Sequence, residues 1–437
     1  MTPHTVHSHD IIAEIRSLAR PLVRPSDLEP LVDRLADDHI ICLGEASHGT
    51  HEFYTWRAEL SRKLIEQGGV RWIGVEGDWP DCWRINQWIR GEGDQSLDAA
   101  TLLERFERWP TWLWANDEVA RFLTWLRGWN SVRPEEERVG FYGLDVYSLW
   151  DSLAEIIAWL DANAPDAVPS ALVAWQCFVP YGQDPQRYAW STRLVPESCE
   201  TPVVELLNTV RERALQREGD AGAFDALQNA EVAAGAERYY RMMVRGDRQS
   251  WNVRDTHMAD TIDRLRAHFG GDSRGLVWEH NTHVGDARAT DMARDGLVNV
   301  GQLVRERHAS VGVALVGFAS HHGDVLAAQD WGSPETIRPV PLAREGSHED
   351  LLHRALGAPA ILIFGEDRSG DWLSSRLGHR AIGVVYEPAR EGLQYVPTVM
   401  GARYDALFWF EDSAALHPLH HEVAPQEQEF ETEPSGF

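Results

Sequence analysis

The sequence is poor in cysteine and has no long apolar run. Only 4 of its 437 residues are cysteines, and they are spaced neither as metal ligands nor as a redox pair. No apolar run approaches the roughly 20 residues that a membrane-spanning helix needs. The N-terminus has no basic region followed by an apolar stretch, so we expect no signal peptide. These absences predict a cytoplasmic protein without a membrane partner.

Basic residues are also scarce relative to acidic ones. Lysine and arginine total 41 against 68 aspartates and glutamates, which gives a formal net charge of −27. Such a charge repels phosphate groups, so neither nucleic acid nor an anionic membrane is an expected partner. The apolar fraction of 43% is ordinary for a globular protein, and a chain of this length buries a large core.

Two kinds of catalytic or binding motif are missing. Neither a phosphate-binding loop nor a dinucleotide-binding glycine turn follows any apolar run. The serine-esterase elbow, Gly-x-Ser-x-Gly, is absent as well, because Ser47 lies in Gly44-Glu-Ala-Ser-His-Gly49, which has one residue too many. His48 directly follows Ser47, and adjacent side chains diverge. A serine triad at this position is therefore not expected.

The chain does contain short apolar runs that alternate with helical patterns. Such runs are typical of parallel strands buried on both faces of a sheet. We expect strands at 40–44, 71–75, 140–144, 275–278, 311–316, 360–364 and 381–386. We expect helices within 11–36, after residue 52, and over a tryptophan-rich stretch at about 81–130.

A different pattern occupies the middle of the chain. Residues 147–268 show helical spacing without a convincing strand, with a loop expected at 179–202. The predicted fold is therefore α/β, a three-layer α/β/α arrangement with a mainly parallel sheet and a large helical insertion. We predict a single domain over residues 1–420, followed by an acidic disordered tail at 421–437.

Several apolar runs end in acids or histidines, and parallel sheets bind ligands beyond the carboxyl ends of their strands. His48 is suited to act as a general base on water, and Glu45 precedes it by three residues, a spacing that places both on one face of a turn. Glu45 could equally cap the following helix. Glu76, at the end of the next strand, is a second acid or an orienting partner. Arg57 either faces solvent or leans back toward the carboxylates.

A second cluster reads Glu279-His280-Asn-Thr-His283. Two histidines at this spacing can share one face of a turn, where they could bind zinc, hold an anionic intermediate or bond to the backbone. The cluster is not a His-Glu-x-x-His motif and has no accompanying cysteine, so a metal is the less favoured interpretation.

Three further residues are candidates for substrate binding. They are Trp79, His51 and His321. The tryptophan-rich stretch is typical of a core, although it would also suit the wall of an apolar pocket. Of the adjacent pair His321 and His322, we expect one side chain to point away from any common site. The acids at Asp145 and Glu366 are expected to be supporting or structural.

These motifs resemble the erythromycin esterase family of macrolide-inactivating enzymes. The residues that show the resemblance are Leu43-Gly-Glu45-Ala-Ser-His48-Gly-Thr, Glu52-Phe, Arg57, Val75-Glu76-Gly, His280-Asn-Thr-His283, residues 403–411 and residues 414–418. The resemblance spans about residues 35–420 and is weakest across the helical insertion.

The resemblance implies a parallel α/β/α sheet and a non-serine hydrolysis in which His48 activates water. Glu45 and Glu76 would orient or assist, while Arg57, His280 and His283 would complete the polar site. A small-molecule ester, such as a macrolactone like erythromycin, is the implied substrate.

Two alternatives remain open. The first is a metal-dependent hydrolase of another ester or of a carbohydrate, with His280 and His283 as ligands of a divalent metal. The second is a non-catalytic protein that binds a hydrophobic ligand. The leading hypothesis assigns no metal ligand and no cofactor.

Overall fold

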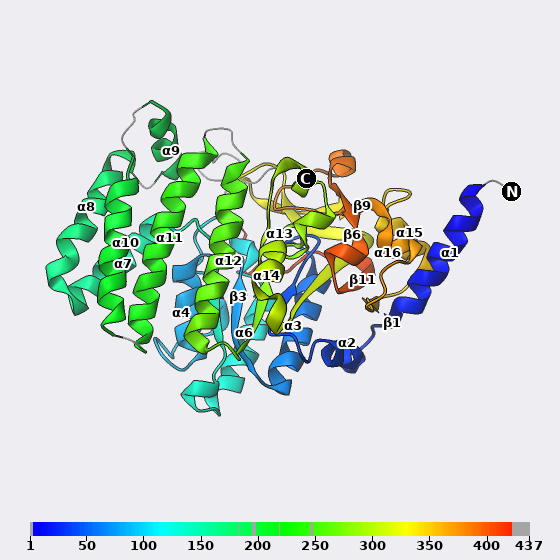
Figure 1. The fold of residues 1–437 in the computed structure, drawn as a ribbon, viewed down its shortest axis with the longest axis horizontal. Coiled ribbons are helices and arrows are strands. Elements are labelled where there is room, and N and C mark those ends of the chain that lie inside the picture. The colour runs from blue at the N-terminus through cyan, green and yellow to red at the C-terminus, as the bar shows by residue number, and fades with distance from the viewer. Residues whose placement is uncertain (1–2, 183, 195–197, 218, 245–247, 422–437) are drawn as a thin grey trace. The chain divides into compact units, whose positions relative to one another are not determined.

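The computed structural model describes residues 3–182, 184–194, 198–217, 219–244 and 248–421 (Figure 1). The chain forms two compact units, which are described separately. Unit 1 comprises Met1–Ile73, Trp88–Gly140 and Phe269–Phe437, and unit 2 comprises Gly74–Gln87 and Phe141–His268. The predicted tail at 421–437 lies outside the described residues, apart from His421. The predicted insertion at 147–268 falls within unit 2, and the single domain at 1–420 stays a prediction.

A mixed, mostly parallel sheet of nine strands is the centre of the fold, so the predicted α/β class is confirmed. Its order is β1-β8-β11-β6-β2-β5-β3-β4, with β7 paired to β6. The strands are β1 (Ala19–Pro21), β2 (Ile40–Leu43), β3 (Val70–Val75), β4 (Gly140–Gly143), β5 (Arg274–Trp278), β6 (Val313–Ala328), β7 (Glu335–Val340), β8 (Ala360–Ile363) and β11 (Ala406–Ser413).

The register of the central strands determines where their polar ends meet. Strand β2 is parallel to both β5 and β6, and Leu43 at its end is paired with Trp278 and Val316. All residues of β2 and β5 are buried, as expected for strands covered on both faces. The loops that follow β2 and β5 therefore leave the sheet at the same edge, and the second residue of each loop, Glu45 or His280, belongs to the predicted site.

Helices of unit 1 connect the strands of this sheet along the chain. They are α1 (Pro3–Leu18), α2 (Glu29–Arg34), α3 (His51–Gln67), α5 (Ala99–Leu103), α6 (Asp117–Ser131), α13 (Asn281–Val284), α14 (Val300–His308), α15 (His348–Leu356), α16 (Asp371–Ser374) and α17 (Met400–Arg403). Among them, α13, α14 and α15 pack against β6. The predicted helix at 81–130 is broken into α4 (Trp79–Ile89), α5 and α6, which are separated by loops containing Gly91 and Pro110.

The strand predicted at 381–386 is wrong. Ile382 and Val385 make only isolated bridges, to Ser47 and Ala328. A two-stranded antiparallel sheet of β9 (Arg376–Arg380) and β10 (Tyr395–Val399) lies beside this segment in the sequence. Ile382 and Tyr386 are buried in one apolar cluster with residues of β6 and β7, and such burial does not require a hydrogen-bonded ladder. Strands β1, β7, β9, β10 and β11 were not predicted.

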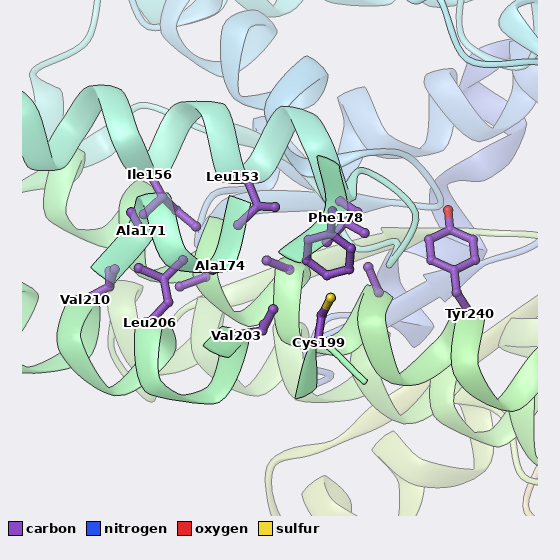
Figure 2. Close-up of a cluster of buried hydrophobic side chains, with 14 of the residues drawn as sticks. Leu153, Ile156, Ala171, Ala174, Phe178, Cys199, Val203, Leu206, Val210 and Tyr240 are labelled. Atoms are coloured by element: carbon purple, nitrogen blue, oxygen red, sulfur yellow. The ribbon is translucent and has the colours of Figure 1, made fainter. Parts of the chain in front are cut away.

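Unit 2 is helical from residue 149 onward, and its described residues between 147 and 268 include no strand, as predicted. Its helices are α7 (Leu149–Asn163), α8 (Val168–Phe178), α9 (Pro185–Leu194), α10 (Glu200–Leu215), α11 (Ala221–Met243) and α12 (Gln249–Phe269). The loop predicted at 179–202 is therefore wrong in part, because it contains α9. Helices α7, α8, α10 and α11 share one apolar core, shown in Figure 2.

A disulfide joins Cys177, near the end of α8, to Cys199, which precedes α10. The two cysteines are 22 residues apart, and nothing in the sequence spacing marked them as partners. Cys42 and Cys82 are free and buried, and burial raises their pKa values well above the ordinary value. No helix in the described part of the chain is long and apolar enough to cross a membrane.

Candidate functional site

The loop that follows β2 is held by backbone contacts on several sides. The N–H of Gly44 donates to the carbonyl of Val316 at 2.8 Å, and the N–H of Asn281 donates to the carbonyl of Glu45 at 2.8 Å. A Cβ atom on Gly44 would lie 2.1 Å from the side-chain oxygen of Asn281, so only glycine permits this close approach. The loop is thus anchored to β6 and to the segment after β5.

Glu45, His48 and Arg57 form a buried ionic group within this anchored loop and α3. His48 Nδ1 lies 2.9 Å from Glu45 Oε1, and Arg57 lies 3.0 Å from Glu45 Oε2. The Arg57 side chain is 0% exposed, and its guanidinium also lies over the rings of Tyr54 and Trp278, at 4.4 and 4.8 Å from their centroids. The spacing of Glu45 and His48 correctly predicted their contact, and Arg57 takes the carboxylate-facing orientation.

This contact defines which nitrogen of His48 carries a proton. A carboxylate oxygen accepts hydrogen bonds, so Nδ1 of His48 carries the proton that it donates to Glu45. In the neutral ring, Nε2 then has the lone pair. The hydroxyls of Ser47 and Thr50 are hydrogen-bonded to each other, which agrees with the rejection of a serine nucleophile.

His280 brings a second imidazole to the same place. Its ring centroid lies 4.7 Å from that of His48. His280 caps α13, because its Nδ1 accepts from the backbone N–H of Thr282 at 3.3 Å and lies 2.8 Å from the Thr282 hydroxyl. In the neutral ring the proton of His280 is therefore on Nε2. His283 lies in the same short helix and is buried.

A buried network that the sequence did not reveal supports this helix. The side-chain amide of Asn281 donates to the carbonyl of Phe318 at 2.8 Å and lies 3.4 Å from His379 Nε2. His379 Nδ1 in turn lies 2.7 Å from Glu349 Oε1. Burial alone would raise the pKa of Glu349, but the His379 hydrogen bond and the charges of His379 and Arg380 outweigh it and hold the pKa at about 2.

Glu76 belongs to unit 2 and has its own ionic group there. Arg254 on α12 donates to Glu76 Oε1 at 2.8 Å and to Asp145 Oδ2 at 2.8 Å. Burial alone would lower the pKa of Arg254, but the charges of Asp145 and Glu76 outweigh it and raise the pKa. Arg254 was not predicted as a site residue. The sequence indicated its role only by placing an arginine on the helix face that carries the apolar residues Val253 and Met258.

The predicted substrate-binding residues lie in three different surroundings. Trp79 is 1% exposed in the core of unit 2, and its indole donates to Asp225 at 2.8 Å. Burial raises the pKa of Asp225 to about 7. In unit 1, His51 and His417 each place Nδ1 at 2.6 Å from Glu118 Oε1.

His321 lies beside His322, with ring centroids 5.0 Å apart, and both fall in one group with Glu411. The prediction that one of this pair points away from a common site is therefore wrong. Burial and the neighbouring histidines lower the pKa of His321 to about 4, so its ring is neutral at pH 7.

Two groups of described residues have the composition and spacing of metal ligands. They are His51, Glu118 and His417, and His321, His322 and Glu411. Neither group contains His280 or His283, the pair that the metal-dependent alternative would require.

Known proteins show similarity over most of the chain. A family model described as erythromycin esterase matches residues 65–413, a range that begins after the Glu45–Arg57 segment. The type I erythromycin esterase of Escherichia coli is 23% identical over 372 residues, which cover 77% of this chain and 86% of that protein. The type II enzyme of Escherichia coli is 29% identical over 120 residues, which cover 28% of this chain and 26% of that protein. This second alignment thus spans about a quarter of the relative.

A solved structure described as a succinoglycan biosynthesis protein has a TM-score of 0.76 and 20% identity. The superposition covers 95% of this chain and 100% of that one. At this identity the likeness shows the fold alone. The family model does not reach the Glu45–Arg57 segment, so the support for a catalytic role of this segment comes from the geometry of the site.

Proposed function

The chain belongs to the erythromycin esterase family of ester-bond hydrolases, and on this premise we propose that it cleaves an ester with water activated by His48. The observation that supports this mechanism is the contact between His48 Nδ1 and Glu45 Oε1 at 2.9 Å. It orients the ring and leaves Nε2 as the basic nitrogen. A neutral imidazole is well matched to base catalysis at neutral pH.

The proposed reaction uses the two neighbouring imidazoles in different roles. His48 Nε2 takes a proton from water, the water oxygen attacks the ester carbonyl carbon, and a tetrahedral oxyanion forms. His280, whose proton is on Nε2, donates a hydrogen bond to that oxyanion. When the C–O bond breaks, the leaving alkoxide takes the proton back from His48. Glu45 stabilises the imidazolium that exists between these steps.

Arg57 has a positioning role in this mechanism. It is ion-paired with Glu45 and fully buried, so it holds in place the carboxylate that contacts His48. We assign His283 to the polar lining around His280. The assisting role of Glu76 stays a prediction, because Glu76 is ion-paired with Arg254 in unit 2.

The substrate is proposed to be a macrolactone such as erythromycin, whose ring opening would inactivate the antibiotic. The names of the two curated relatives support this choice. Substrate contacts by Trp79, His51 and His321 remain predictions. The test is incubation of the purified chain with erythromycin and a panel of simpler esters, with mass spectrometry to detect the addition of one water.

A matched set of variants tests the mechanism once a cleaved ester is known. His48→Ala should lower kcat by about 10²–10⁴-fold, the usual contribution of a general base. Glu45→Gln should also lower kcat, because an amide can hold His48 in the wrong tautomer. His308→Ala, at the end of α14, is the control and should retain turnover. Wild-type turnover by a folded His48→Ala protein would refute the proposal.

No metal is assigned to the reaction, and the cytoplasmic location also stays a prediction. Turnover that survives treatment with a chelator would agree with the water-activating histidine, whereas its loss would favour a metal-dependent hydrolase. The Cys177–Cys199 disulfide weighs against a reducing compartment, where such bonds are rare. Cell fractionation decides the location.

A further inference from the structure

A second cluster of imidazoles and carboxylates lies where β6, β11 and α15 meet. His321 and His322 are consecutive on β6, Glu411 is on the neighbouring parallel strand β11, and His353 extends from α15. One ligand atom each of His321, His322 and Glu411 lies within 4.8 Å of the others. None of these residues takes part in the proton transfers proposed at His48, and of the four only His321 is a predicted substrate contact.

The backbone of this cluster is firmly held. Strands β6 and β11 are in register, with Asp412 opposite His322. The hydroxyl of Ser413 donates to the carbonyl of His322 at 3.1 Å. The guanidinium of Arg380, which is 2% exposed, donates to the carbonyl of His321 at 2.8 Å. The three side chains are therefore presented by a rigid frame.

Outer partners contact two of the three side chains and leave their inner atoms unpaired. Asp412 Oδ1 lies 3.0 Å from His322 Nε2, so a proton on Nε2 faces a carboxylate and Nδ1 has the lone pair. His353 Nδ1 lies 2.5 Å from Glu411 Oε1, and its ring stacks on that of His321 at a centroid distance of 3.9 Å. The second oxygen of Glu411 is thereby turned away from His353.

Three inner atoms are buried and have no hydrogen-bond partner among the described residues: His321 Nδ1, His322 Nδ1 and Glu411 Oε2. Buried polar atoms are normally paired, and three unpartnered polar atoms at one place are costly to bury. A cation bound by all three atoms would remove that cost.

We propose that His321, His322 and Glu411 bind a divalent transition-metal ion of the zinc type. Two imidazoles and one carboxylate suit zinc better than calcium or magnesium, which prefer oxygen ligands. Three protein ligands leave one position for water. Asp412 and His353 are the outer partners that orient His322 and Glu411, as second-layer carboxylates and histidines do at other zinc sites.

The other His–Glu group of unit 1 does not have three buried, unpartnered ligand atoms, so it serves as the control. In that group both His51 and His417 donate to Glu118 Oε1, so their Nδ1 atoms are satisfied within the protein. The hydrogen bonds also raise the pKa of His51. His417 is 58% exposed, so its replacement by alanine should leave the fold intact.

The experiment is a titration of the tag-free, chelator-treated full chain with Co²⁺, followed by competition with Zn²⁺. Wild type should bind one Co²⁺ at this cluster with visible d–d absorption, and Zn²⁺ should displace it. Glu411→Gln and His322→Ala should abolish the absorption, and His353→Gln should weaken binding by about 10–100-fold, the usual effect of losing an outer partner. His417→Ala should bind as wild type does.

Three outcomes would overturn the proposal. They are no absorption with the wild type, unchanged binding by both Glu411→Gln and His322→Ala, or loss of binding by His417→Ala alone. Circular dichroism of each variant checks folding. The result is independent of the hydrolysis at His48, because the readout is the bound metal and not turnover.

Discussion

Replacing Arg57 with methionine should lower the free energy of unfolding by about 3–5 kcal/mol, the usual cost of removing one partner of a buried ion pair. Arg57 is 0% exposed and lies 3.0 Å from Glu45 Oε2. Without the guanidinium, the buried carboxylate loses its ion pair and keeps the hydrogen bond from His48. Contacts of the guanidinium with the rings of Tyr54 and Trp278 would be lost as well.

A double-mutant cycle separates the ion pair from the packing. Glu45→Gln leaves Arg57 charged without its carboxylate, so it should be destabilising by a similar amount. The double variant contains neither charge, and it should be more stable than the sum of the two losses predicts, by about 1–3 kcal/mol. Urea unfolding followed by tryptophan fluorescence measures all four proteins.

A neighbouring pair on the same helix provides the control. Arg62 lies 2.6 Å from Glu59, and both side chains are partly exposed, at 26% and 25%. Arg62→Met should cost no more than about 1 kcal/mol, because water screens such pairs. If Arg57→Met costs as little as Arg62→Met, or if the losses in the cycle are additive, the buried ion pair does not stabilise the catalytic loop.

Two further predictions concern the frame around this loop. A Cβ on Gly44 would lie 2.1 Å from a buried amide oxygen, whereas a Cβ on Gly271 would meet nothing within 4 Å, so thermal unfolding should show a large loss for Gly44→Ala and almost none for Gly271→Ala. Equal melting temperatures for the two variants would contradict this. The pKa of Glu349 is lowered from 4.5 to about 2, so its stabilisation is complete above pH 4.5 and is lost as the pH falls toward 2. Glu349→Gln should remove a contribution of about 3 kcal/mol to the acid dependence of stability, and an unchanged pH profile would refute it.

The sequence predicted the parts of the fold that depend on local pattern. The strand cores at 40–44, 71–75 and 275–278 agree with β2, β3 and β5 to within about a residue, because each is a short apolar run flanked by polar or glycine residues. The described residues of the helical block at 147–268 include no strand, as predicted. Strand β11 was not predicted, although it pairs with both β6 and β8.

In the site, too, the sequence predicted the local contacts and not the long-range ones. Glu45 and His48 are three residues apart, and their contact follows from the geometry of a single turn, so the sequence alone indicated it. Arg57, on the next helix, was recognised as one of two alternatives. The roles assigned to these residues in catalysis remain predictions.

Long-range contacts were decided by the tertiary structure alone. Arg254 reaches Glu76 across 178 positions of the chain, and no local spacing connects them. The pairing of His322 with the strand that contains Glu411 likewise depends on the register of β6 and β11. Local patterns set which backbone conformation a segment prefers, whereas the burial of charge and the alignment of distant strands are settled only when the whole core packs. The sequence by itself therefore determined central strands such as β2, β3 and β5 and the Glu45–His48 turn, and folding decided which distant charges and histidines meet.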